Sequence, residues 1–98
     1  MAKQRIAVIF GGASSEHEVS CVSASSVISN IPQDDYEVVC IGITKKGKWL
    51  FYPGEWDQIA GGQWEKNPDC CACMVSMDNA KRGIYKILDD QTVSFLSI

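Results

Sequence analysis

Two continuous apolar runs in the first half of the chain, with one amphipathic segment between them, constrain the fold most strongly. The runs RIAVIF (5–10) and YEVVCIGIT (36–44) do not alternate with polar residues, which is typical of strands buried on both faces of a parallel sheet. Residues 16–30 predict a helix that Pro32 ends, with an apolar stripe of Ala24, Val27, Ile28 and Ile31. Strand, helix and strand in this order predict a right-handed βαβ unit.

The second half of the chain predicts small β pieces. A lysine-rich turn at 45–48 leads into a short aromatic strand that Pro53-Gly54 closes, and residues 55–69 predict a loop with one helical turn. Three further strands are expected in CCACMVSM, GIYKIL and TVSFLSI, and the first two of these predict an antiparallel hairpin.

These elements predict an α/β fold with a Rossmann-like parallel sheet, incomplete, and an added small β-hairpin region. One helix covers only one face of a parallel sheet. We therefore expect Trp49, Trp56 and Trp64 to cover the open face. An incomplete sheet also has an unpaired edge, which predicts pairing or strand swapping with a second copy of the chain.

Composition excludes several classes of function. The net charge of −3 over 98 residues provides no basic field for nucleic acid or for an anionic membrane. No apolar run approaches the ~18 residues that span a bilayer, and the amino-terminal apolar run is too short for a signal peptide, so a cytoplasmic protein is expected. Five cysteines and a single histidine favour small buried thiols over disulfides or a metal site.

The turn after the first strand carries the residues suited to a ligand. Gly11 and Gly12 shape this loop and let a ligand approach the backbone closely. The dinucleotide fingerprint and the phosphate loop are both absent, and the turn has no lysine. A glutamate at the start of the helix would repel a phosphate. The turn therefore suits a cation or an ammonium group.

The two glutamates of the turn have different expected roles. Ser15 and Glu18 fit a capping box, which gives Glu18 a structural role. Glu16 is not needed for that box, so it either favours the helix dipole or binds a ligand. At about 100° per residue, Glu16 and Ser20 fall toward the apolar stripe, at the edge of the sheet where ligands bind in open α/β folds. His17 could act as an acid–base group, but without a partner an ordinary helix residue is expected.

The stretch VIFGGASSEHEVSCVSASSV closely resembles the amino-terminal signature of the D-alanine–D-alanine ligases, almost without a break over residues 8–24. The resemblance implies the ATP-grasp architecture. It also implies a bacterial enzyme, active as a homodimer, that uses ATP and Mg²⁺ (or Mn²⁺) to join two D-alanines through an acyl phosphate for peptidoglycan synthesis. By the same resemblance, Glu16 holds the ammonium group of the first D-alanine, Val19 lines its pocket and Ser20 supports the glutamate or the loop.

The resemblance further implies that residues 1–98 form a truncated amino-terminal domain, without the central and carboxyl-terminal ATP-grasp domains. We therefore expect neither ligase activity nor bound ATP or metal from the chain alone. A D-alanine–D-lactate ligase is an alternative, because it shares this signature. A self-contained small-molecule binding module and an interaction domain that uses the tryptophans as a contact surface are further alternatives.

Overall fold

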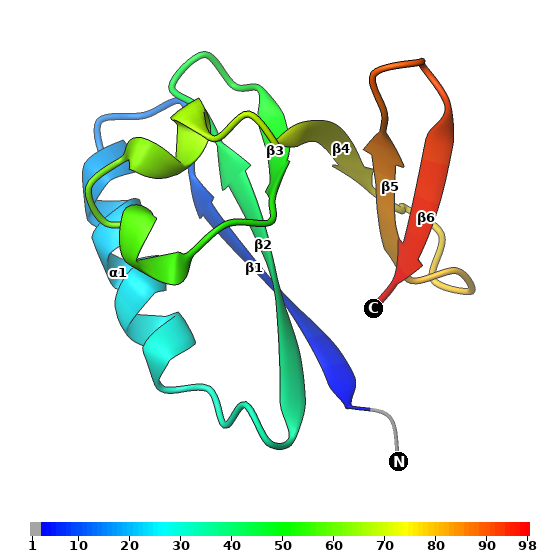
Figure 1. Ribbon diagram of the computed structural model, residues 1–98, viewed down its shortest axis with the longest axis horizontal. Coiled ribbons are helices and arrows are strands. Elements are labelled where there is room, and N and C mark those ends of the chain that lie inside the picture. Colours follow the sequence, from blue (N-terminus) through cyan, green and yellow to red (C-terminus); the bar gives the residue numbers. More distant parts are fainter. Residues whose placement is uncertain (1–2) are drawn as a thin grey trace.

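The computed structural model describes residues 3–98, in which one helix packs on a single six-stranded sheet (Figure 1). Two short 3₁₀ turns lie between the third and fourth strands. The elements in chain order are β1 (Gln4–Gly11), α1 (His17–Ser29), β2 (Tyr36–Ile43), β3 (Trp49–Tyr52), η1 (Trp56–Gln58), η2 (Gln63–Lys66), β4 (Cys71–Val75), β5 (Gly83–Ile87) and β6 (Val93–Ser97).

Strand order in the sheet follows the sequence, β1-β2-β3-β4-β5-β6. Only β1 and β2 pair in parallel, and every later pair is antiparallel. The α/β class and the β4–β5 hairpin are therefore confirmed. The Rossmann-like parallel sheet with an added small β-hairpin region is not confirmed, since all six strands form one mixed sheet. The short β2–β3, β4–β5 and β5–β6 connections explain this, because a parallel crossover needs about a dozen residues or more.

Strand β1 is less buried than its apolar sequence predicts. Phe10 is its only fully buried residue, and 47% of Ile9 remains exposed. The reason is its place at an edge of the sheet, where it pairs with β2 alone. In β2, which has a neighbour on each side, residues 39–42 are all buried, as the sequence predicts for a strand covered on both faces.

Helix α1 buries a stripe that is turned relative to the predicted one. It ends at Asn30, as expected, but 54% of Val27 is exposed. The buried residues are instead His17, Cys21, Ala24 and Ile28. Both sets have spacings of three and four residues, so periodicity alone does not choose between them. Contact with the rest of the core selects the stripe that includes the small side chain of Cys21.

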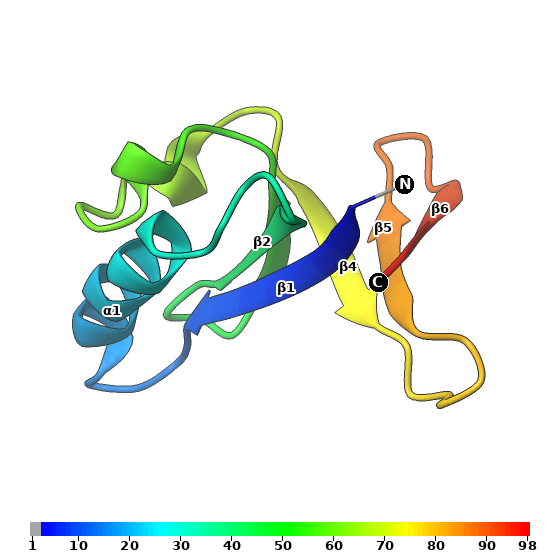
Figure 2. The same cartoon turned by 90° about the horizontal axis from the view of Figure 1, so that it is seen from below.

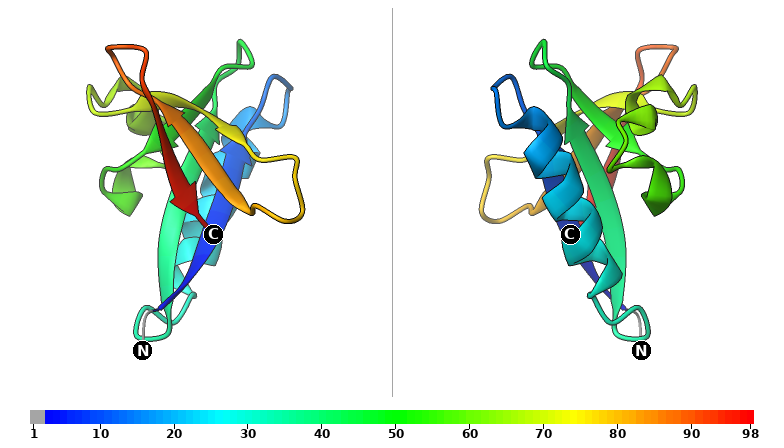
Figure 3. Two further views of the ribbon diagram at one scale, coloured as in Figure 1. Left: turned by 90° about the vertical axis from the view of Figure 1, so that its right-hand side faces the viewer. Right: turned by 90° about the vertical axis from the view of Figure 1, so that its left-hand side faces the viewer.

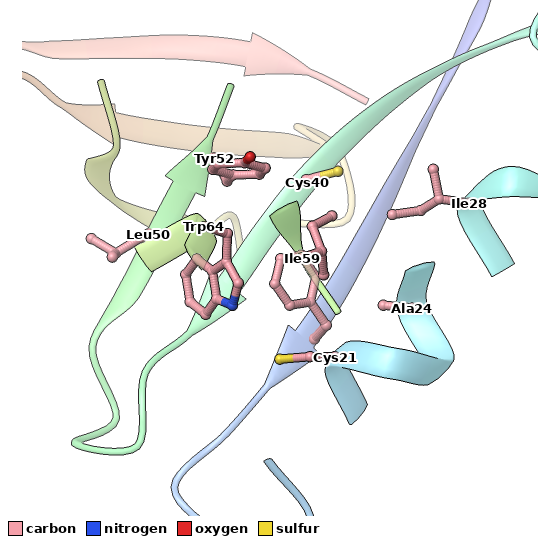
Figure 4. Close-up of a cluster of buried hydrophobic side chains, with 9 residues drawn as sticks. Cys21, Ala24, Ile28, Cys40, Leu50, Tyr52, Ile59 and Trp64 are labelled. Atoms are coloured by element: carbon pink, nitrogen blue, oxygen red, sulfur yellow. The ribbon is translucent and has the colours of Figure 1, made fainter. Parts of the chain in front are cut away.

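A first core cluster lies between α1 and the sheet (Figure 4). Trp64 is completely buried there and packs edge-on against Phe10, with ring centroids 5.1 Å apart. The segment that carries η1 and η2 therefore covers the same face of the sheet as the helix. The prediction that the tryptophans cover the open face is wrong for Trp64 and Trp56, because both pack in this cluster on the helix side. Trp49 stays 37% exposed.

The opposite face of β1 and β2 is covered by the sheet itself, because its second half curls back across the first (Figures 2 and 3). A second core cluster fills the space between them: Ala7, Val39, Ile41, Phe51, Cys73, Ile84 and Leu96. The Arg5 side chain donates a 3.1 Å hydrogen bond to the Ser97 carbonyl and thereby links β1 to β6. The helix and the 3₁₀ segment thus cover one face of the parallel strands, and the second half of the sheet covers the other.

Candidate functional site

The loop between β1 and α1 is held tightly against β2. Gly11 has φ +87° and Gly12 has φ +115°, which are left-handed conformations that side chains disfavour. A Cβ atom on Gly11 would collide with the carbonyl oxygen of Ile43. The Gly12 N–H donates to that same oxygen at 2.9 Å. The two glycines therefore let the chain turn away from the sheet directly beside β2.

Two side chains of α1 reach back to this loop. The Ser20 hydroxyl accepts a 3.0 Å hydrogen bond from the Gly11 N–H. The His17 ring lies with Nδ1 3.0 Å from the Gly12 carbonyl oxygen. Only 4% of the surface of His17 is exposed, and this burial was not predicted from the sequence. Its spacing of four residues from the buried Cys21 is the signal that could have revealed it.

The predicted capping box does not form. Helix α1 begins at His17, Glu16 occupies the N-cap position, and no side chain caps the helix. Ser15 was therefore wrongly predicted as the cap, and Glu18 as its partner. The Glu18 carboxylate instead pairs with Lys45 in the β2–β3 turn. The helix therefore begins one residue later than predicted, and Glu18 pairs with Lys45, which is distant in the sequence.

The two glutamates differ in their electrostatic partners. The hydrogen bond from Lys45 holds the pKa of the exposed Glu18 carboxyl below its ordinary value. The Glu16 carboxylate makes no hydrogen bond or ion pair with any residue between 3 and 98. Glu16 is exposed at the carboxyl end of β1, at the point where the helix begins. Of the two acids, Glu16 is thus the one that remains available to a cationic ligand.

The first turn of α1 brings the other predicted site residues beside Glu16. The Ser20 N–H donates to the Glu16 carbonyl at 2.9 Å, and 58% of Val19 is exposed. A hollow of about 230 Å³ lies beside this helix start and is lined by His17, Glu18, Cys21, Lys45, residues 60–62 and Glu65. Glu16 does not line it. This hollow is therefore not formed around the Glu16 carboxylate.

The described residues hold no cluster of metal ligands. Among residues 3–98, no three His, Cys, Asp or Glu side chains gather closely enough to hold a metal ion. The β1–α1 turn also ends in a glutamate, which opposes phosphate at the helix start. All five cysteines are free, and Cys21, Cys40 and Cys73 are buried as small apolar side chains. Residues 3–98 contain no helix with the length and hydropathy of a membrane span.

Comparison with known protein families identifies the family of this chain. Residues 5–94 match the family described as "D-ala D-ala ligase N-terminus". The chain belongs to this ligase family. A D-alanine–D-alanine ligase from Caldicellulosiruptor bescii is 42% identical over 98 residues, which are all of this chain and 26% of that protein. A second, from Ruminiclostridium cellulolyticum, is 60% identical over 65 residues, which are 66% of this chain and 17% of that protein.

Solved structures of ligases share the fold. The VanG D-Ala:D-Ser ligase from Enterococcus faecalis superposes with a TM-score of 0.88 at 35% identity, over 99% of this chain and 27% of that one. The D-alanine–D-alanine ligase from Coxiella burnetii gives a TM-score of 0.68 at 24% identity, over 82% of this chain and 24% of that one, and supports the fold alone. The present chain therefore spans about a quarter of the length of these relatives.

Proposed function

We propose that this chain is the D-alanine-binding amino-terminal part of an ATP-dependent D-alanine–D-alanine ligase of bacterial peptidoglycan synthesis. Membership of the ligase family and the likeness to solved ligases support this proposal. Under this proposal, the ATP-grasp domains of the whole enzyme bind ATP and Mg²⁺ (or Mn²⁺) outside residues 3–98. The whole enzyme acts as a cytoplasmic homodimer. The 98-residue chain then binds the first D-alanine but does not catalyse ligation by itself.

The observation that carries the proposal is the contrast between Glu16 and Glu18. Glu18 is ion-paired with Lys45, whereas the exposed Glu16 carboxylate has no partner among residues 3–98 and lies on a loop held in place by backbone and side-chain hydrogen bonds. Such a carboxylate can pair with the ammonium group of D-alanine and orient it. Val19 offers an exposed apolar surface one helical turn away for the substrate methyl group. Ser20 fixes the loop through Gly11.

The second substrate has alternatives that rest on different observations. The solved relative with a TM-score of 0.88 is named a D-Ala:D-Ser ligase, which makes D-serine the second candidate for the attacking amine. D-Lactate, which would attack through a hydroxyl, has the support of the shared signature alone. The family match favours all three ligases over a self-contained binding module.

A chimeric ligase tests the proposal. Residues 5–94 would replace the aligned segment of the Caldicellulosiruptor bescii enzyme, and phosphate release would be measured with D-alanine alone, with D-alanine plus D-serine, and with D-alanine plus D-lactate. We expect turnover with D-alanine alone. Glu16→Gln should lower kcat/KM about 30- to 200-fold, since a charge-assisted contact worth about 2–3 kcal/mol is lost.

The matched control is Glu18→Gln, which removes the same charge two residues away. Because Glu18 is exposed and its partner is a surface lysine, kcat/KM should stay within about threefold of the parent chimera. Equal losses in the two variants would contradict the assignment of Glu16. A well-folded chimera without turnover in any mixture would contradict the proposed function.

A further inference from the structure

The loop that carries Glu16 is closed into a ring by a single side chain. Its backbone leaves the sheet at Gly12 and enters the helix at His17, and the imidazole of His17 returns to the Gly12 carbonyl at 3.0 Å. Residues 13–16 lie between these two points. Closing so short a ring removes much of the conformational freedom of the residues inside it.

The position of the imidazole is itself fixed from two sides. The indole ring of Trp64, which is completely buried, lies nearly parallel to the His17 ring, with centroids 6.4 Å apart and planes at 25°. On another side, the imidazole Cε1 lies so close to Gly11 that a Cβ atom there would be only 3.2 Å away. The His17 ring therefore cannot swing away from the loop without disturbing the core.

The Gly12 carbonyl also determines which ring nitrogen carries the proton. A carbonyl oxygen only accepts hydrogen bonds, so Nδ1 of a neutral His17 must be the protonated nitrogen. The imidazole is buried, so its N–H donor is costly to leave without an acceptor. The hydrogen bond thus couples the imidazole to the backbone immediately before the loop.

We infer that His17 is a positioning residue for D-alanine binding. Through its hydrogen bond to the Gly12 carbonyl, His17 holds residues 13–16 in the conformation that presents the Glu16 carboxylate. This inference rests on the proposed function, because it assumes that Glu16 binds the substrate ammonium. Ser20 holds the preceding residue, Gly11, so the two side chains of α1 fix both glycines of the turn. Binding then spends less energy on ordering the loop.

The test uses the 98-residue chain and nuclear magnetic resonance. Long-range ¹⁵N–¹H correlations should show neutral His17 protonated at Nδ1, and a D-alanine titration should shift the amide signals of residues 12–20. His17→Phe keeps an aromatic ring against Trp64 but loses the donor, and should raise the dissociation constant about tenfold. His17→Asn keeps an N–H donor near the position of Nδ1, and should stay within about threefold of wild type.

The outcomes separate the inference from the proposed function. A proton on Nε2, or a folded His17→Phe chain that binds D-alanine as tightly as wild type while Glu16→Gln does not, would overturn the inference alone. Equal losses of affinity in the Phe and Asn variants would also overturn it, because the N–H donor that Asn keeps would then give no protection. A wild-type chain with the Nδ1 proton but no D-alanine binding would overturn the proposed function and the positioning role with it.

Discussion

Replacing Gly11 by alanine tests whether the β1–α1 loop depends on close contact with β2. Two costs are expected. The left-handed φ of +87° costs an alanine about 1–2 kcal/mol. In addition, the new Cβ would collide with the Ile43 carbonyl, which accepts the Gly12 N–H, and would displace the Gly11 N–H from Ser20. Weakening these two hydrogen bonds costs about 2 kcal/mol more.

Gly47→Ala is the matched control for this variant. Gly47 has nearly the same φ, +84°, but a Cβ atom there would meet nothing within 4 Å, so this variant has only the conformational cost. Thermal and urea unfolding followed by circular dichroism would measure both. We expect Gly11→Ala to be less stable than Gly47→Ala by about 2 kcal/mol, or roughly 8–16 °C in Tm for a domain of this size. Equal destabilisation would refute the contact between the loop and β2 as a source of stability.

Two further predictions concern titrating groups. Burial raises the pKa of the Cys40 thiol to about 11. In the native chain at pH 8, Cys40 should therefore react with iodoacetamide far more slowly than the partly exposed Cys71. Mass spectrometry of native and unfolded samples would measure both rates, and equal rates in the native chain would contradict the burial of Cys40. For Glu18, the lowered pKa means that its pairing with Lys45 stabilises the fold above pH 4.5, the ordinary value, and is lost as the pH falls through the lowered pKa. A ¹³C titration should therefore give a higher Glu18 midpoint in Lys45→Ala than in wild type, and an unchanged midpoint would contradict the ion pair.

The sequence selected Glu16, Val19 and Ser20 as a candidate site, which stays a prediction, but it did not predict the contacts that hold the loop. The absence of phosphate-loop glycines and lysines favoured an ammonium ligand, and the surplus of one glutamate favoured Glu16. The capping role of Glu18 was wrong, because the sequence pattern does not reveal that Lys45 lies across the helix start. The burial of His17 was missed for a similar reason. Its partners, Gly12 and Trp64, come together only when the 3₁₀ segment covers the helix side of the sheet.

Sequence by itself determined the local elements of this protein. The β-branched runs, the glycine pair, the proline after the helix and the short polar turns act on the backbone within a few residues, so they specify strands, helix and hairpins in the right order. Tertiary structure alone decided which surfaces are buried. The curl of the sheet over its own parallel strands and the turn of the buried stripe onto His17 and Cys21 depend on contacts between segments far apart in the chain. The spacing of apolar residues fits neighbouring faces of a helix equally well, and only the segment that packs against the helix decides which face is buried.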